Sequence, residues 1–324
     1  MPDYGAQIAD KTIANTVRKI HKVYQKAASD LRKELNDFTE HFAKQDKEQK
    51  ALVDAGKITA AEYNAWRDRQ IFRRKQWQDK LDQAVKIMND ANAEAVEVVK
   101  HGKLNVFAEN YNYNAYQLEK KVKGAVNFNI YNEQTVARLV RKRPKVLPEW
   151  KINEKKDYIW NRRKVNNTVV QGIIEGKDIG QISKDLMHNL CTQNENKMRT
   201  FARTSITGAQ NAGRQAQMED AEDMGIILKK RWVATLDDRT RDLHADLDGQ
   251  EVPVDEPFKV DGYEIDFPGD PSAEPEMVYN CRCTMIQVYE GIERHSVRRD
   301  MDDNMVEDMT YNEWKRWKEG LADE

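Results

Sequence analysis

"NENKMRTFARTSITGAQNAGRQAQMEDAEDMG", residues 194–225, is the stretch that decides the fold. It is rich in Ala, Gln, Glu, Arg and Met, which are good helix formers, and Gly225 is of the residue type that most often ends a helix. The next residues, "IILKKRWVATL" (226–236), are rich in β-formers, and strand alternation puts Trp232 and Ala234 on one face. This change of period predicts a long helix that is followed directly by a sheet.

Short strands and turns are predicted for the residues that follow. "DDRTRDLHADLDG" (237–249) is typical of a turn, one short helix and a second turn. "QEVPV" (250–254), "YEIDF" (263–267) and "CTMIQVYE" (283–290) are predicted strands, and loops rich in Gly and Pro separate them. We therefore expect residues 195–290 to form a compact α+β module with short antiparallel strands, built on the long helix.

The N-terminal residues are predicted to be helical. Residues 7–50 contain no Gly or Pro, Gly56 can end this first helix, and Thr59 with Glu62 forms a capping box for the next one. The second helix is expected to stop at Gly102, and residues 104–123 are expected to form a third helix with an aromatic face. The second helix carries one apolar stripe, made of Trp77, Leu81, Val85, Met88, Ala95 and Val99.

Four segments are expected along the chain, and the predicted fold class is α+β. "RKRPKVLPEW" (141–150) marks a boundary, because each of its two prolines disfavours helix at the residue before it. A helix is predicted at 153–176 and a short one at 178–190. The segments are a helical hairpin or bundle at 1–140, a basic helical connector at 141–194, the α+β module at 195–290 and an acidic tail at 291–324.

The tail is expected to contain a short amphipathic helix. Thr310 and Glu313 form a capping box, and Trp314, Trp317 and Leu321 follow on one helical face. Such an aromatic ridge, opposite a charged face, is typical of a helix that docks into a groove of another protein. The alternative is that the helix folds back onto the α+β module.

Composition limits the class of protein. Of 324 residues, 33% are charged and 39% are hydrophobic, which is typical of a helix-rich, folded chain. No apolar run approaches the ~20 residues that cross a membrane, and residues 1–20 lack the features of a signal peptide. Three cysteines are too few for a disulfide framework. We expect a protein that is made and used in a reducing cytoplasm and has no membrane partner.

The net charge is −2, but the charged residues are distributed unevenly along the chain. Residues 138–164 contain 11 Lys or Arg and 3 Asp or Glu, whereas residues 235–277 contain 3 and 14, respectively. The basic stretch is interleaved with Trp150, Tyr158 and Trp160, so it can contact phosphates and stack bases. A solvated helix face, or a surface for an acidic protein partner, is the alternative that we favour.

Two cysteines lie two residues apart in "VYNCRCTM" (278–285). In a strand, Cys281 and Cys283 point to one side and Arg282 to the other, and a disulfide between them would be strained. Their thiols suit a zinc site with His244 and a fourth group, for which Asp270, Asp248 or water are the candidates. Two alternatives stay open: both cysteines are buried small hydrophobes, which we favour, or they are reactive thiols. Metal binding would release thiol protons, so the affinity would fall as pH falls.

No established catalytic pattern is present in the sequence. It has no Gly-rich phosphate loop, no nucleophile elbow, no H-E-x-x-H and no calcium-binding loop. His244 stands among several aspartates, which is most often the setting of a hydrogen-bonded structural histidine. We therefore expect the chain not to be an enzyme and to need no cofactor, with zinc as the one candidate.

Four ordered blocks carry a resemblance to a known family. "FARTSITGAQNAGRQAQ" (201–217), "KRWVATLDDRTRDLHADLDGQEVPVDEPF" (230–258), "FPGDP" (267–271) and "VYNCRCTM" (278–285) resemble the phage Mu F-like head morphogenesis family, the minor head or minor capsid proteins. "NAWRDRQ", "WQDKLDQ" and "AENYNYNAYQLEK" are similar to the helical N-terminal region of such proteins from tailed phages.

The resemblance implies a virion protein that is present in few copies. It implies association with the portal vertex, entry into the procapsid during head assembly, and a role in genome packaging or ejection. The implied location is the head interior near the portal vertex, after assembly in the host cytoplasm. The implied partners are the portal protein and a major capsid or scaffold protein. We expect Tyr111, Tyr113 and Tyr116 to act as aromatic anchors for the portal protein.

The resemblance also bears on the cysteines. Some relatives carry a fuller set of candidate metal ligands, a C-x-x-C pair after D-x-R-T and a His-Pro pair before C-R-C. In this chain Arg241 stands at the first of those cysteines, His244 at the second, and Val278 and Tyr279 replace the His-Pro pair. Only His244, Cys281 and Cys283 remain as candidate ligands.

Two other functions are weighed against a minor head protein. A metal-dependent nuclease or transferase would use Asp238, Arg239, His244 and the two cysteines, and chelator-sensitive activity would identify it. A DNA-binding accessory protein that travels with the genome would make non-specific DNA contact through the basic stretch at 138–164.

Overall fold

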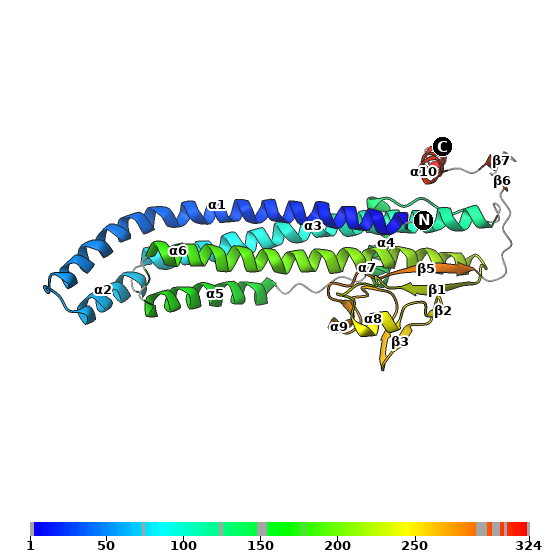
Figure 1. Ribbon diagram of the computed structural model, residues 1–324. Coiled ribbons are helices and arrows are strands. Elements are labelled where there is room, and N and C mark those ends of the chain that lie inside the picture. Colours follow the sequence, from blue (N-terminus) through cyan, green and yellow to red (C-terminus); the bar gives the residue numbers. More distant parts are fainter. Residues whose placement is uncertain are drawn as a thin grey trace. The chain divides into compact units, whose positions relative to one another are not determined.

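Figure 1 shows a computed structural model of the chain, which describes residues 3–72, 75–122, 126–147, 154–175, 177, 179–289, 297–299, 305–307 and 310–322. The helices are α1 (Tyr4–Asp54), α2 (Ala60–Phe72), α3 (Lys75–Lys121), α4 (Glu133–Lys142), η1 (Pro144–Val146), α5 (Glu154–Ile174), α6 (Ile179–Met187), η2 (His188–Thr192), α7 (Gln193–Asp223), α8 (Asp242–Asp246), α9 (Pro275–Val278) and α10 (Tyr311–Ala322). The strands are β1 (Leu228–Val233), β2 (Glu251–Pro253), β3 (Phe258–Val260), β4 (Tyr263–Ile265), β5 (Thr284–Tyr289), β6 (Val297–Arg299) and β7 (Met305–Glu307).

The chain packs into two compact units. Unit 1 comprises Met1–Thr16, Val99–Trp150 and Thr200–Glu324, and unit 2 comprises Val17–Val98 and Lys151–Arg199. The helices α1, α3 and α7 each contribute residues to both units. The predicted α+β class, with long helices before a small antiparallel sheet, is confirmed. The four segments expected along the chain stay a prediction, because the units are defined by packing in space.

Unit 2 is a helical bundle whose core contains a chain of amides. Asn161 of α5 donates to Asn89 of α3, and Asn194 of α7 donates to Asn161. Asn92 of α3 donates to Asn194 and accepts from Tyr24 of α1. Since a buried amide is costly without a partner, this network favours one register of the helices over others. The apolar stripe predicted for residues 77–99 is buried where its side chains are described. In unit 2 these side chains are Leu81, Val85, Met88 and Ala95.

In unit 1 the helix α3 passes through Gly102 without a break, so the predicted stop there is wrong. A Cβ on Gly102 would lie 3.0 Å from Thr16 Oγ1 of α1 and 3.4 Å from Ile206 Cδ1 of α7. The absence of a side chain at Gly102 thus allows α3 to pack closely against α1 and α7. The break predicted between 178–190 and the long helix is also wrong, because α6, the π-helical turn η2 and α7 form one continuous helical path.

The sheet of unit 1 has the strand order β2-β1-β5, and both pairings are antiparallel. β1 alternates strictly between buried and half-buried residues, and it turns Leu228, Lys230 and Trp232 to the core. The strands β3 and β4 form a hairpin, as do β6 and β7. The strands expected in 250–254, 263–267 and 283–290 are confirmed, whereas β3 was not predicted.

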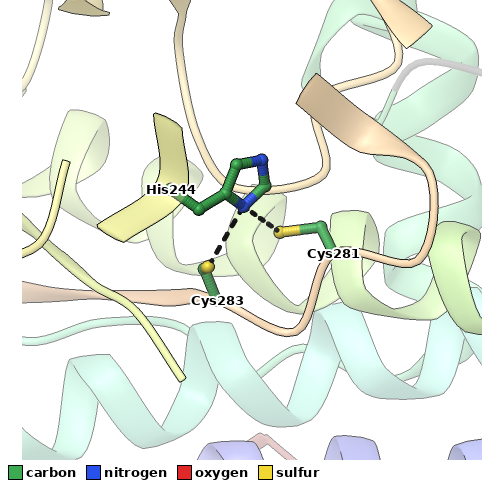
Figure 2. A group of neighbouring side chains, drawn as sticks. All are labelled: His244, Cys281 and Cys283. Atoms are coloured by element: carbon green, nitrogen blue, oxygen red, sulfur yellow. Dashed lines mark hydrogen bonds between the residues drawn. The ribbon is translucent and has the colours of Figure 1, made fainter. Parts of the chain in front are cut away.

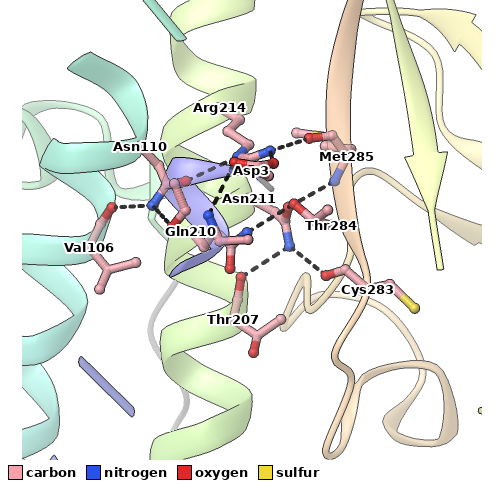
Figure 3. Close-up of polar contacts among 12 residues, drawn as sticks. Asp3, Val106, Asn110, Thr207, Gln210, Asn211, Arg214, Cys283, Thr284 and Met285 are labelled. Atoms are coloured by element: carbon pink, nitrogen blue, oxygen red, sulfur yellow. Dashed lines mark hydrogen bonds and ion pairs between the residues drawn. The ribbon is translucent and has the colours of Figure 1, made fainter. Parts of the chain in front are cut away.

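α7 completes the free edge of β5 with side chains (Figure 3). Asn211 Oδ1 accepts from the Met285 amide at 3.1 Å, and Arg214 Nη1 donates to the Met285 carbonyl oxygen at 2.8 Å. Arg214 also contacts Asp3 at the start of α1 through two nitrogens, at 2.6 and 2.7 Å, and donates to Asn110 of α3 at 3.0 Å. Since an unpaired strand edge invites association, these contacts both cover the edge and dock the sheet on the helices.

The tail helix α10 packs on the chain's own α3. Trp314 is fully buried, and its Nε1 donates to Glu119 Oε2 at 2.7 Å. Lys318 is also buried and donates to Glu119 Oε1 and to the Phe128 carbonyl oxygen, both at 2.9 Å. The predicted capping box Thr310–Glu313 is confirmed. The expected docking ridge is wrong, because Trp314 already lies in the core of unit 1; the side chain of Leu321 is outside the described residues.

The tyrosines expected as anchors for a partner are mostly part of the same core. Tyr111 and Tyr116 are buried, and Tyr113 packs against them half-buried. Tyr111 stacks on Tyr131 with ring centroids 4.0 Å apart and donates to Asp220 at 2.6 Å. They hold unit 1 together and do not form an exposed aromatic surface. Among the helices described, none combines the length and apolar character needed to cross a bilayer.

Replacing Trp314 tests whether the tail belongs to the core. Trp314→Ala is expected to lower the free energy of unfolding by about 3–5 kcal/mol, because it opens a cavity and leaves Glu119 with one partner fewer. Trp317→Ala is the matched control, since Trp317 is only half-buried and a smaller loss is expected. Chemical denaturation measures both. Equal and small losses for the two variants would show that α10 is detached from the core.

Candidate functional site

His244, Cys281 and Cys283 come together in unit 1 as a buried cluster. His244 lies on α8, and the two cysteines lie between α9 and β5. Their nitrogen and sulfur atoms all lie within 4.8 Å of one another, and the residues are 2–3% exposed. Figure 2 shows both sulfurs facing the same ring nitrogen, with His244 Nδ1 3.3 Å from Cys283 Sγ and 3.7 Å from Cys281 Sγ. The structure thus brings together all three residues that the sequence singled out.

A turn at Asn280 aims both cysteines inward. Asn280 has a φ of +54°, a left-handed conformation that Asn tolerates better than most residues. Its amide donates to Thr204 Oγ1 of α7 at 3.0 Å, and the Cys281 amide closes the turn on the Val278 carbonyl oxygen. The cysteines do not lie in a strand, because β5 begins at Thr284, opposite the last residue of β1. Both thiols still face one side, as expected.

The proposed fourth ligands do not join the cluster. Asp248 accepts from the Ala234 amide at 2.8 Å, and Asp270 accepts from the Ser272 amide at 2.8 Å. Within the described part of the chain, the group therefore has three donor atoms. A structural zinc site normally has four protein ligands, so these three would leave one position to water or another group.

Arg241 closes the other side of the imidazole. Its Nη1 lies 3.3 Å from His244 Nε2, and its Nη2 donates to the carbonyl oxygen of Tyr279. Trp232 meets the His244 ring edge-on, with centroids 5.7 Å apart. Sequence reasoning missed these roles of Arg241 and Trp232. The three-residue spacing of Arg241 and His244 around a short helix was the available signal.

The two thiols are electrostatically unequal. A hydrogen bond from Cys281, together with one from His244, lowers the pKa of the Cys283 thiol. The same hydrogen bond to Cys283, with burial, raises the pKa of Cys281. The two thiols and His244 Nδ1 thus form one hydrogen-bonded group. The third cysteine, Cys191, belongs to unit 2, where burial raises its pKa to about 11.

The residues proposed for an enzyme do not converge. Asp238 and Arg239 are exposed in the loop before α8, whereas His244 is buried. Arg282 points away from the cluster, as expected, and pairs with Asp237, whose pKa this ion pair lowers. The three residues of the cluster are buried, and both cysteines belong to the core of unit 1. Its geometry suits a link between α8 and the turn before β5.

A second candidate surface lies on α5 in unit 2. Tyr158, Ile159 and Trp160 are 42, 48 and 38% exposed, and Arg162 and Arg163 are exposed beside them. Between and after these residues on α5, Asn161, Val165 and Val169 are buried. Trp150, which the sequence placed in the same basic stretch, lies outside the described residues. α5 therefore presents apolar rings and cations together.

Two comparisons with known proteins point to a family of phage head proteins. The family described as Phage Mu protein F like protein matches residues 163–286. The chain is 30% identical over 220 residues to the minor head protein GP7 of Bacillus phage SPP1, which covers 65% of this chain and 69% of that protein. It is also 28% identical over 152 residues to the uncharacterized protein YqbB of Bacillus subtilis, which covers 44% of this chain and 48% of YqbB. No solved structure matches the chain.

One relative carries the name of an enzyme. The chain is 35% identical over 150 residues to the NAD(+)--arginine ADP-ribosyltransferase EFV of Enterococcus faecalis, which covers 46% of this chain. The match spans 30% of EFV, so this chain corresponds to less than a third of that protein.

Two glycines set the distance between α7 and the loop that precedes the cluster. A Cβ on Gly208 would lie 2.4 Å from the carbonyl oxygen of Gly269, and Gly269 itself has a φ of +82°. Because backbone cannot rotate away as a side chain can, Gly208→Ala is expected to lower the free energy of unfolding by about 1–3 kcal/mol. The control is Gly320→Ala in α10, where a Cβ meets open space and no loss is expected. Wild-type stability of Gly208→Ala in urea denaturation would contradict the close approach.

Proposed function

Because this chain belongs to the phage Mu protein F-like family of minor head proteins, we propose that it is a structural, non-enzymatic component of a phage head that associates with the portal vertex. The proposal extends to entry into the procapsid during head assembly and to a place in the head interior. Membership in the family is the observation that carries it.

The buried cluster supports a structural role. His244, Cys281 and Cys283 are buried, whereas Asp238 and Arg239, the charged residues weighed for an enzyme, are exposed. The match to EFV spans 30% of that protein, so the activity that its name states is not carried over to this chain. An NAD-dependent transfer of ADP-ribose to arginine is the activity to exclude. Incorporation of label from NAD into an arginine-rich protein, above that of a boiled sample, would overturn the non-enzymatic proposal.

The α5 surface is the proposed contact with an acidic partner. Exposed rings beside Arg162 and Arg163 combine apolar area with cations, which suits an acidic protein surface such as that of a portal or scaffold. Tyr111 and Tyr116 of α3 are buried, so we do not propose them as contacts with the partner protein. DNA is a second candidate for the same surface, since rings beside cations also suit stacked bases and phosphates.

A charge reversal on α5 tests the contact. The double variant Arg162→Glu/Arg163→Glu is expected to lose copurification with the portal protein of the same genome, because it replaces two cations with anions. The matched control is Lys19→Glu/Lys22→Glu, which reverses two exposed charges on α1 in the same unit. Equal recovery of the portal with both double variants would contradict a portal contact through α5.

The same variants decide between protein and DNA. If α5 contacts phosphates, the α5 double variant should bind duplex DNA more weakly, and the slope of log affinity against log salt should fall by about 1 for each lost phosphate contact. Fluorescence anisotropy with a labelled duplex measures this. An unchanged slope, with portal binding lost, assigns the surface to the protein partner.

A further inference from the structure

Arg241 decides which nitrogen of His244 carries the proton. A guanidinium has five N–H donors and no acceptor, so His244 Nε2, 3.3 Å from Arg241 Nη1, must act as the acceptor. A neutral imidazole has one donor and one acceptor, and the proton therefore sits on Nδ1. Figure 2 shows that Nδ1 is the atom that faces Cys281 and Cys283. The N–H thus points into the space between the two sulfurs.

This arrangement opposes a metal ion at the same place. Coordination by Nδ1 needs a lone pair there, which would shift the proton to Nε2, 3.3 Å from a guanidinium nitrogen that is also a donor. Coordination by Nε2 is blocked, because that atom faces Arg241 and not the sulfurs. A divalent ion would also add positive charge close to a guanidinium that is always protonated.

Arg241 is held in this position from a second direction. Its Nη2 donates to the carbonyl oxygen of Tyr279, in the turn that leads to Cys281. The residue stands directly before α8, so the backbone of His244 and the side chain of Arg241 are fixed by the same helical turn. The guanidinium therefore connects α8, the imidazole and the cysteine turn, which are the parts that a metal ion would connect.

We propose that Arg241 is a positioning residue that takes the place of a metal ion in the His244–Cys281–Cys283 cluster. It holds His244 with the proton on Nδ1 and thereby makes the cluster independent of metal. Removal of the guanidinium frees Nε2 to carry the proton, and the three remaining donors then form an open site for zinc or cobalt, with water as the fourth ligand.

Metal titration of the full chain tests the exclusion. Wild type, purified without chelator, is expected to hold less than about a tenth of an equivalent of zinc and to show no absorption bands of tetrahedral cobalt–thiolate on addition of Co²⁺. Arg241→Ala is expected to bind about one equivalent and to show those bands. Arg239→Ala is the control, since it removes an exposed cation from the same loop and should behave as wild type.

Three results would overturn the proposal. The first is stoichiometric zinc in wild type, and the second is absence of cobalt bands in an Arg241→Ala protein whose circular dichroism is that of wild type. The third does not depend on Arg241→Ala and holds even if that variant does not fold. Selective ¹⁵N labelling of histidine, with His244→Gln to assign the signal, reports the tautomer of His244 in wild type. A proton on Nε2, or on both nitrogens, would contradict the proposed role of Arg241.

Discussion

A guanidinium with almost no access to water is the constraint on which unit 1 depends. Arg214 is 1% exposed and cannot lose its charge, so its donors have to find acceptors inside the protein. Those acceptors are the carboxylate of Asp3, the amide oxygen of Asn110 and the carbonyl oxygen of Met285. The start of α1, the last third of α3 and β5 must therefore meet at Arg214 of α7. β5 then fixes Cys283, one residue before it, and with it the buried cluster.

Much of the fold was predictable because short sequence patterns, such as helix caps, determine it. Gly56 adopts the left-handed conformation expected of a helix-ending glycine, and both capping boxes form as predicted. The predictions that failed concern residues whose surroundings are set by a partner far away in the sequence. Gly102 lies close to Thr16 of α1, and Trp314 of α10 is buried with its N–H donating to Glu119. Lys230 is another residue whose surroundings depend on a distant partner. It faces the core and donates to the Asp266 carbonyl oxygen, and burial lowers its pKa to about 8.

The spacing of the two cysteines in the sequence predicted part of the cluster. Two cysteines separated by one residue were expected to face one side, and they do, although a turn and not a strand puts them there. His244 was expected beside them and lies there. The position of Arg241 against the far ring nitrogen was not predictable, because an arginine side chain is long and its partner is set by the turn at Tyr279. The proposed exclusion of metal from this cluster rests on that contact.

The free energy of unfolding as a function of pH, for wild type and Asp3→Asn, tests the central constraint most directly. Burial opposes ionisation of Asp3, but the hydrogen bonds and charge of Arg214 outweigh it and lower its pKa below the ordinary value of 3.8. A lowered carboxyl pKa stabilises the fold above the unfolded value, and this contribution disappears as pH falls through the folded value. We expect Asp3→Asn to lose about 3 kcal/mol at pH 7, because it leaves the buried guanidinium without its counter-charge, and the loss should vanish at low pH. Asp90→Asn, on an exposed carboxylate of α3, is the control. A pH profile of Asp3→Asn that coincides with that of wild type would contradict the account.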